Sequence, residues 1–223
     1  MNKVLVVSPH PDDETLGCGG VVLRHKKEGD EINWLIVTSI TEKADYKLKK
    51  IEGRAIEIQA VSNAYGFLSV HQCGFPTTML DTIPISIIIK KISTIIHEID
   101  PNIVYLPYRG DVHTDHRIVF DAVSSCLKWF RHPSVKRVLS YETLSETEAA
   151  ANPDNNAFRP NVFINISSFL EKKIEIMKIY NDELGVFPFP RSIEAIRAMA
   201  LLRGAASGFK AAEAFMLLKE IIE

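Results

Sequence analysis

The fold follows from one stretch, Val4-Leu5-Val6-Val7-Ser8-Pro9-His10-Pro11-Asp12-Asp13-Glu14, in which proline, histidine and acidic residues come straight after an apolar run. Apolar runs of this length are typical of fully buried strands, and we predict one over residues 3–8. Residues 15–27 continue as a helix that stops near Gly29. The stretch therefore predicts a strand, then a tight polar turn, then a helix.

Strands and helices alternate along most of the chain. Beyond the opening stretch, we predict strands over residues 31–38, 67–73, 102–107, 135–142 and 162–166. We predict helices over residues 44–64, 84–99, 114–130, 167–180, 191–202 and 211–222, and a loop over residues 149–160 with the turn formers Pro153, Asp154, Asn155 and Asn156. Alternation through the first 130 residues predicts an α/β fold, with a parallel sheet covered by helices on both faces.

The composition argues against several classes of protein. The formal net charge is −2 with no basic tail or stripe, which argues against nucleic acid as a general partner. The cysteines are odd in number and widely separated (Cys18, Cys73 and Cys126), so we expect no disulfide framework and a reducing cytoplasm. We expect no secretory signal, and the isoleucine-rich run at residues 83–99 is too short and too polar to span a membrane.

A second polar cluster, Asp111-Val112-His113-Thr114-Asp115-His116, follows the strand predicted at residues 102–107. Parallel sheets bind ligands outside the carboxyl ends of their strands, so we expect both clusters to meet at one edge of the sheet. His10, Asp13 and His116 then supply three metal ligands and leave one position open. An open position is typical of a catalytic zinc site.

The other polar residues of the two clusters indicate acid–base roles. Asp12 projects differently from Asp13 and would accept a proton from water activated by the metal. His113 lies one turn from His116 and would face the substrate, as a general acid or an oxyanion stabiliser. Asp115 would orient His113 or a metal ligand. The alternatives are that Asp12 or Asp13 only caps the helix after the first cluster, and that the second cluster is a group of exposed polar residues around a helix N-terminus. The occurrence of both clusters after buried strands disfavours these alternatives.

Two motifs closely resemble the signature of the LmbE-like or PIG-L deacetylases: the first cluster followed by Gly17-Cys18-Gly19-Gly20, and His113-Thr114-Asp115-His116. Two weaker family elements are similar to Arg54-Ala55-Ile56-Glu57 and Ala212-Glu213-Ala214-Phe215. The resemblance runs along nearly the whole chain. It implies a Rossmann-like three-layer sandwich with a mostly parallel sheet. It also implies one domain over residues 1–223, in which residues 1–130 form the core and residues 131–223 complete the substrate site.

The resemblance also implies an activity. Members of the family are zinc-dependent hydrolases that remove the acetyl group from N-acetylglucosamine units attached to another group, and they release acetate and a free amino sugar. Carried over by position, the ligands of one zinc ion per chain would be His10, Asp13 and His116. Asp12 would be the general base, and His113 would stabilise the oxyanion and help to protonate the leaving amine.

Further features of the site and of the assembly follow from the same resemblance. Asp115 would tune His113, Arg54 would contact the sugar or its attached group, and Asp81 is the candidate for binding sugar hydroxyls. Iron and cobalt are alternatives to zinc for the same ligands. Members often form trimers or hexamers, so we expect a cytoplasmic homo-oligomer.

Arginines outside the family motifs bear on the charge of the substrate. Arg109 precedes His113 by four residues, and we expect it to bind an anionic group of the sugar conjugate, because arginine binds phosphate and carboxylate bidentately. For Arg191 and Arg197 we expect solvated charges or salt bridges. For Arg203, the sequence does not decide between substrate binding and a surface charge. Two rival functions remain. One is a zinc hydrolase of a different amide or ester. The other is a nucleotide-binding Rossmann protein without hydrolase activity, which the absence of a G-x-G-x-x-G turn disfavours.

Overall fold

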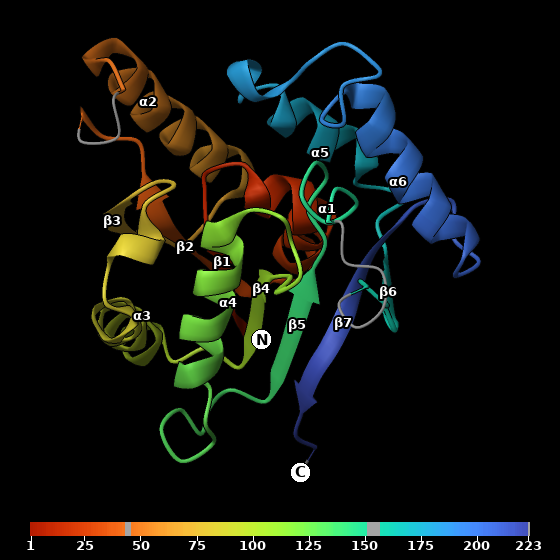
Figure 1. Cartoon of the computed structure of the whole chain (residues 1–223). Helices are drawn as coiled ribbons and strands as arrows, with labels where there is room; N and C mark the ends of the chain where they lie inside the picture. Colours follow the sequence, from red (N-terminus) through yellow and green to blue (C-terminus); the bar gives the residue numbers. More distant parts are fainter. Residues whose placement is uncertain (43–45, 151–156, 223) are drawn as a thin grey trace.

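The computed structural model describes residues 1–42, 46–150 and 157–222, and in this part of the chain seven strands form one sheet between two layers of helices (Figure 1). Most of the sheet consists of five parallel strands: β1 (Lys3–Ser8), β2 (Glu31–Ser39), β3 (Ser69–Pro76), β4 (Ile103–Pro107) and β5 (Arg137–Tyr141). One edge is completed by β6 (Val162–Asn165) and β7 (Ala212–Glu220), in the order β3-β2-β1-β4-β5-β7-β6. The predicted α/β fold with a mostly parallel sheet is therefore confirmed.

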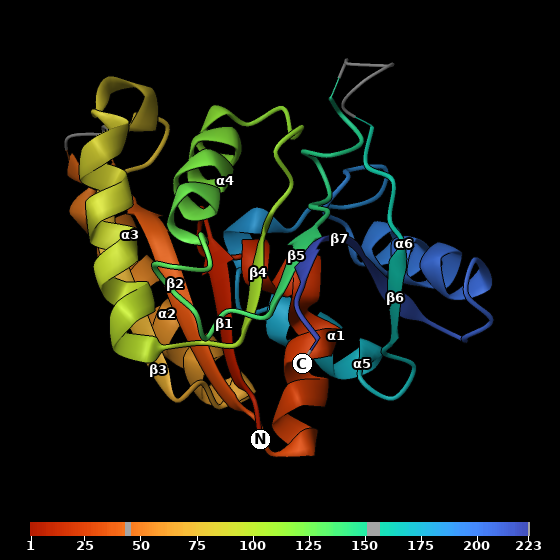
Figure 2. The ribbon, with the colours of Figure 1, turned by 90° about the horizontal axis from the view of Figure 1, so that it is seen from below.

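Helices cover both faces of the sheet, as Figures 1 and 2 show from two directions. One face carries α1 (Asp13–Glu28), α2 (Leu48–Tyr65), α5 (Leu170–Met177) and α6 (Ile193–Ala205), and the other carries α3 (Ile85–Ile99) and α4 (Thr114–Cys126). Side chains of β1 alternate between the two cores: Val4 and Val6 enter the first, and Leu5 and Val7 enter the second. All four are fully buried, which explains the unbroken apolar run in the sequence.

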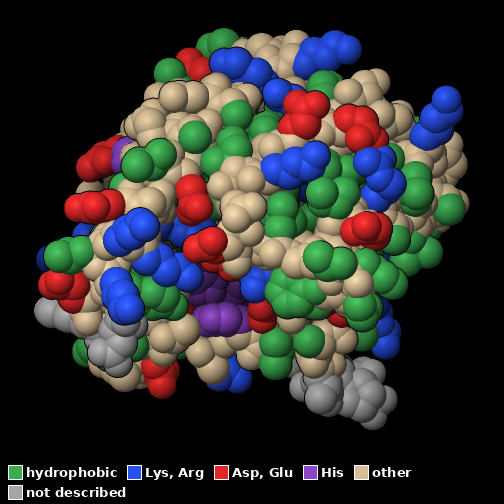
Figure 3. Space-filling model, turned by 90° about the horizontal axis from the view of Figure 1, so that it is seen from above, with side chains coloured by type: hydrophobic (Ala, Val, Ile, Leu, Met, Phe, Trp, Pro, Cys, Tyr) green, Lys and Arg blue, Asp and Glu red, His purple; other side chains and the backbone are tan. Residues whose placement is uncertain are grey.

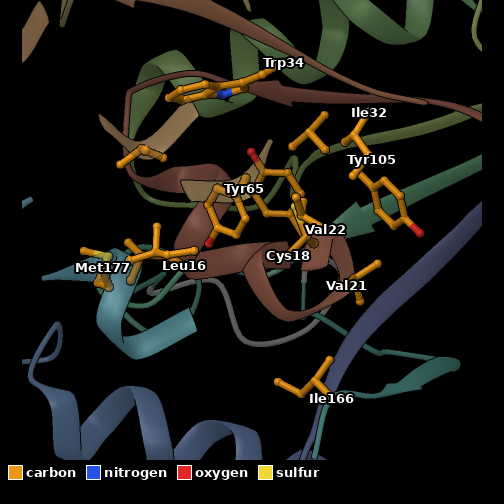
Figure 4. Packing of buried hydrophobic residues seen from close by; sticks show 14 of the residues in the cluster. Leu16, Cys18, Val21, Val22, Ile32, Trp34, Tyr65, Tyr105, Ile166 and Met177 are labelled. Atoms are coloured by element: carbon orange, nitrogen blue, oxygen red, sulfur yellow. The ribbon is translucent and has the colours of Figure 1, made fainter. Parts of the chain in front are cut away.

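Aromatic side chains pack α1 against the sheet (Figure 4). Trp34 and Tyr65 are buried, and each polar tip has a partner. The indole Nε1 of Trp34 donates to Ser8 Oγ at 2.9 Å, and the Tyr65 hydroxyl donates to Thr15 Oγ1 at 3.0 Å. These contacts combine burial of apolar area with satisfied hydrogen bonds, so they fix α1 and the turn that precedes it.

The order of the strands reverses at β1, which lies between β2 and β4. The chain leaves β1 for α1 on one face of the sheet, and it leaves β4 for α4 on the other face. At such a switch point a crevice opens outside the carboxyl ends of the two strands. The two polar clusters follow these two strands, so they lie at this crevice.

Residues 211–222, which we predicted as a helix, contain strand β7 (Ala212–Glu220) instead, so that prediction was wrong. The segment Ala212–Glu220 reads AEAFMLLKE and is rich in residues of high helix propensity. It lies between β5 and β6 and is antiparallel to both, so its backbone pairs on both sides. Phe215 is fully buried there and meets Tyr105 edge-on, with ring centroids 5.3 Å apart. Pairing and burial therefore override the local preference of this segment.

Other predicted elements differ from the structure mainly at their ends. α2 begins at Leu48 rather than at residue 44, which lies outside the described residues. α4 ends at Cys126 rather than at residue 130, and α5 is shorter than the helix predicted over residues 167–180. Of the predicted loop, the turn formers Pro153, Asp154, Asn155 and Asn156 lie outside the described residues.

The three cysteines are free and buried, in agreement with the expected absence of disulfides. In the described part of the chain, no helix has both the length and the apolar composition needed to cross a membrane.

α1 is broken at Cys18, whose backbone (φ −144°, ψ 19°) is not helical. A buried ion pair satisfies the backbone groups at the break. Glu213 accepts hydrogen bonds from the N–H groups of Gly20 and Val21, both at 2.8 Å. Lys173 Nζ donates to the carbonyl of Leu16 at 2.9 Å. The ammonium of Lys173 and the carboxylate of Glu213 are 2.7 Å apart. Residues of α5 and β7 thus hold α1, whose first residue is Asp13.

Candidate active site

The turn after β1 and the start of α4 bring three potential metal ligands together. His10 and Asp13 come from the turn and the first residue of α1, and His116 comes from the first turn of α4. One ligand atom of each lies within 4.8 Å of the others. Asp13 Oδ2 is 3.2 Å from His10 Nδ1 and 3.3 Å from His116 Nε2. Residues from the two sequence clusters therefore form one group at the edge of the sheet.

Asp12 adopts a backbone conformation that is rare for residues with a side chain. Its φ of 126° lies in the left-handed region, which costs about 1–3 kcal/mol for a residue other than glycine. Hydrogen bonds hold this turn: the Asp12 N–H donates to Glu14 Oε2 at 3.0 Å, and the His10 N–H donates to Asp13 Oδ2 at 2.8 Å. As a result, the adjacent carboxylates of Asp12 and Asp13 have different partners.

Two further carboxylates hold the histidine rings. Asp111 Oδ2 is 2.8 Å from His116 Nδ1, and both residues are buried. Asp115 Oδ2 is 3.1 Å from His10 Nε2. We expected Asp115 to tune His113 or to orient a metal ligand, and its carboxylate contacts the predicted ligand His10 rather than His113. Asp111 had no predicted role, although its place at the end of a strand, five residues before His116, was an available signal.

The environment of this group fits a divalent metal ion. His116 Nε2 is buried and makes no hydrogen bond of good geometry within the described residues, although it lies 3.3 Å from Asp13 Oδ2 and Nδ1 of the same ring is held by Asp111. Burial would lower the pKa of His116, but Asp13 and Asp111 raise it well above its ordinary value. Burial would also lower the pKa of His10, but hydrogen bonds to Asp115 and Asp13 outweigh this effect and raise the pKa to about 9. The carboxylates therefore stabilise positive charge at this point, as they would a bound cation.

Asp12 lies outside the ligand group and contacts a basic residue from the C-terminal part of the chain. Arg191 Nη1 is 3.2 Å from Asp12 Oδ2 and 3.3 Å from Glu183 Oε2. Burial raises the pKa of Asp12 well above its usual range, and Asp13 and Glu183 add to that rise, whereas Arg191 opposes it. A raised pKa makes a carboxylate a better proton acceptor. Arg191 forms salt bridges, as expected, but these lie within the site.

These side chains line a cavity of about 260 Å³ at the carboxyl edge of the sheet. Figure 3 shows histidines within a hollow, with acidic and basic side chains around its rim. His113 and Arg54, both predicted for this site, belong to the lining. His113 Nδ1 accepts a hydrogen bond from the backbone N–H of Asp115 at 3.1 Å, and burial, followed by the charges of His10 and His116, lowers its pKa. Because Nδ1 accepts this bond, the neutral ring carries its proton on Nε2.

Several arginines and one aspartate that we considered for the site lie outside its cavity. Arg109 is half exposed, and its guanidinium contacts both carboxylate oxygens of Asp121, at 2.6 and 3.3 Å. Asp81 is exposed in the short 3₁₀ helix Leu80–Thr82. Arg197 and Arg203 pair with glutamates. The expectation that Arg109 and Asp81 bind substrate therefore has no support in their positions. The lining also includes residues that no sequence pattern singled out, namely Tyr46, Thr143, Glu146 and Glu183, together with Arg191, for which we had expected a role outside the site.

Fold and site together define an α/β protein with a candidate metal centre at the switch point of its sheet. The profile of the PIG-L family, described as GlcNAc-PI de-N-acetylase, matches residues 5–127, which is more than half of the chain. The chain therefore belongs to the PIG-L family, and the resemblance stated from its motifs is confirmed. Both polar clusters lie within the matched residues.

Two relatives that match most of the chain are named as deacetylases. The chain is 26% identical over 228 residues to the diacetylchitobiose deacetylase of Thermococcus kodakarensis, which covers 96% of this chain and 82% of that protein. It is 25% identical over 189 residues to the probable N-acetyl-alpha-D-glucosaminyl L-malate deacetylase 2 of Bacillus cereus, covering 81% and 83% of the two chains. The crystal structure of the conserved protein TT1542 from Thermus thermophilus is similar with a TM-score of 0.78 and 26% identity, over 100% of this chain and 97% of that one.

Proposed function

We propose that this protein is a zinc-dependent N-deacetylase. Its substrate is a conjugate of N-acetylglucosamine or a related N-acetylhexosamine, and its products are acetate and the free amino sugar. The observation that carries the proposal is the group of His10, Asp13 and His116, whose ligand atoms lie within 4.8 Å of one another and in which the buried His116 Nε2 faces Asp13 Oδ2 without a well-formed hydrogen bond. Membership of the PIG-L family supports the reaction. Relatives named as deacetylases of diacetylchitobiose and of an N-acetylglucosaminyl malate support the substrate class.

His10, Asp13 and His116 would hold one zinc ion per chain. Two imidazoles and one carboxylate form a donor set found in catalytic zinc sites, and the same donors also accept iron or cobalt. A bound zinc ion supplies a Lewis acid that polarises the acetamide carbonyl and acidifies a water molecule. Asp111 and Asp115 orient the two imidazoles and so maintain the donor set.

Asp12 is the general base in this proposal. Its carboxylate accepts a proton from the attacking water, while the contact from Arg191 holds Oδ2 in place. The same proton passes to the amide nitrogen as the C–N bond breaks, and the products are acetate and the amine. His113 donates from Nε2 to the carbonyl oxygen as that oxygen gains negative charge. Arg54, on the cavity wall, contacts the sugar or its attached group.

Acetate release by zinc-loaded protein tests the proposal. The panel contains free N-acetylglucosamine and its malate, inositol, phosphate, nucleotide and chitobiose conjugates. We expect acetate from at least one conjugate, and a loss of rate of about 10²–10⁴-fold in Asp12→Asn, because a general base contributes about that factor. Asp121→Asn removes a carboxylate outside the cavity and should keep the wild-type rate. If no conjugate releases acetate while elemental analysis finds one zinc per chain, the deacetylase is refuted and a different amide or ester is favoured.

A further inference from the structure

A second cavity lies beside the catalytic one, at the start of α2. Its volume is about 290 Å³. Arg54 lines both cavities, so the two share a wall. In Figure 3, basic side chains gather next to the hollow that contains the histidines. The other lining residues of the second cavity are Lys47, Lys49, Lys50, Gly53, Glu57 and Asp182.

The three lysines bring an excess of positive charge to this cavity. All three are exposed, and among the described residues none of them forms an ion pair with a carboxylate. Lys47 is the residue that precedes α2, and Lys49 and Lys50 lie in its first turn, which contains no acidic residue. Most helices place acidic side chains at this end, where they offset the positive end of the helix dipole. Here the side chains add to that positive potential, which an anion would offset.

The acidic residues of the cavity do not cancel this charge. Glu57 is 3.3 Å from Arg54 Nε, and Arg54 also pairs with Glu183. Burial raises the pKa of Glu57, and the charges of Asp182 and Glu183 add to the rise, which Arg54 and Lys50 oppose. Glu57 and Glu183 are thus engaged with the arginine, and Asp182 is the one further acidic residue of the lining, against three lysines. Among the described residues, the lysines are the basic groups of this wall that have no ion pair with a carboxylate, although Lys50 Nζ lies over the Tyr46 ring, 5.6 Å from its centroid.

We propose that this cavity binds a phosphate group on the part of the substrate that is attached to the acetylated sugar. The inference rests on the proposed deacetylase function, which places the acetamido group in the catalytic cavity. Three lysines supply point charges that suit a phosphate dianion, whereas a single carboxylate is best matched by the planar fork of an arginine. The arginines near this wall, Arg54 and Arg191, are already paired with carboxylates. Arg109, which we expected to bind the anion, lines neither cavity.

Kinetics with two matched sugars test the subsite. N-acetylglucosamine 1-phosphate and methyl N-acetylglucosaminide, in the same anomeric configuration, differ only in the group at C1. At constant ionic strength, we expect the phosphate to raise kcat/KM at least tenfold, mainly through a lower KM. This preference should be lost in the double variant Lys49→Ala/Lys50→Ala. The control Lys90→Ala/Lys128→Ala removes the same charge from exposed lysines outside both cavities and should keep it. UDP-N-acetylglucosamine, as a third substrate, distinguishes a nucleotide diphosphate sugar from a simple sugar phosphate.

Binding without turnover separates failure of this inference from failure of the proposed function. Glucose 1-phosphate and methyl glucoside carry no acetyl group, so calorimetry compares their affinities directly. We expect the wild type to bind the phosphate at least tenfold more tightly, and Lys49→Ala/Lys50→Ala to bind both sugars equally. Equal binding by the wild type, or an undiminished preference in the double variant, overturns the lysine subsite and leaves deacetylation standing. If no sugar releases acetate, the proposed function fails, and the calorimetry still decides whether the subsite exists.

Discussion

Asp111 and Asp115 each hold the ring of a histidine that would bind the metal. Asp111 contacts His116 at 2.8 Å and also accepts a hydrogen bond from a threonine hydroxyl at 2.6 Å. Asp115 contacts His10 at 3.1 Å and accepts a backbone N–H at 2.7 Å. Because both carboxylates are themselves fixed, the two rings have little freedom to turn. The donor atoms are therefore positioned before any ion arrives.

Removing the Asp111 carboxylate tests this arrangement. We expect Asp111→Ala to weaken zinc binding about 10- to 100-fold, because His116 loses the partner that fixes its ring. Competition with a chromogenic chelator measures the affinity. Asp121→Ala, which removes a carboxylate that pairs with Arg109 outside the cavity, is the matched control. Wild-type affinity in Asp111→Ala would show that the ring is held by other contacts.

The sequence allowed a prediction that the two polar clusters meet, because each one directly follows a strand of a parallel sheet. It gave no such marker for Arg191, which reaches Asp12 from 179 residues away. The placement of Arg109 could not be predicted either. It stands at a strand end, as a binding residue would, but Asp121 on the following helix pairs with its guanidinium. Side-chain partners of this kind depend on packing between elements, which local pattern does not contain.

Among the elements, α1 and β7 depend on each other through Lys173 and Glu213. Strand and helix in the first 130 residues could be predicted because apolar runs and helical periods alternate there. The strand β7 could not, because its sequence favours a helix and only its neighbours in the sheet provide partners for its backbone. The break in α1 could not be predicted from the sequence either, because residues from two distant elements stabilise it.

Breaking this buried ion pair should be costly. We expect Lys173→Met to lower the free energy of unfolding by about 3–5 kcal/mol, because it leaves the carboxylate of Glu213 buried without its partner. Urea denaturation measures the change. Lys172→Met, at the exposed neighbouring position, should have little effect. The double variant Lys173→Met/Glu213→Gln should lose less than the sum of the single changes, and strict additivity would mean that the pair is not coupled.

The end of α1 is tied to the start of β1 through Asp30, which gives this contact a pH dependence. Asp30 accepts hydrogen bonds from the backbone and side chain of Asn2, at 2.6 and 3.2 Å, and contacts His25 Nδ1 at 2.7 Å. Burial alone would raise the pKa of Asp30, but the bonds from Asn2 and His25 outweigh it and lower the pKa below its usual value. Because the folded-state pKa is the lower one, the stabilisation is present above the unfolded pKa, near 4. This stabilisation is lost as the pH falls through the pKa that Asp30 has in the folded protein.

Comparing Asp30→Asn with the wild type tests that pH dependence. We expect the wild type to be the more stable protein at pH 7, and the difference in free energy of unfolding to shrink as the pH falls toward 3. Asp100→Asn, at an exposed helix end, is the control and should show no such trend. A difference between Asp30→Asn and the wild type that stays constant from pH 7 to pH 3 would contradict the assignment.

Across the whole molecule, the candidate centre joins segments that leave the sheet on opposite faces. His10 and Asp13 precede and begin α1, and His116 belongs to α4. An ion held by all three would therefore link the two helical layers at the switch point. Only the folded chain brings the three together, so binding adds to the stability of the whole fold.

Zinc should accordingly raise the melting temperature. At a free zinc concentration about 100 times the dissociation constant, linkage adds about 2.7 kcal/mol. For a chain of this size that energy corresponds to a rise of about 5–10 °C. Differential scanning fluorimetry with zinc and with a chelator measures the change. Asp13→Asn should abolish the shift and Asp121→Asn should retain it. The same shift in Asp13→Asn would place the stabilising ion elsewhere.

The break in α1 also bears on when the site is assembled in a living cell. Glu213 lies 193 residues after the first N–H group that it binds. A ribosome that adds about 5–20 residues per second therefore needs on the order of 10–40 s to travel from one partner to the other. Throughout that interval the nascent α1 lacks its hydrogen bonds to Glu213, although the turn that carries His10 has already been synthesised. We expect the centre to take its final shape only after β7, which carries Glu213, has been synthesised.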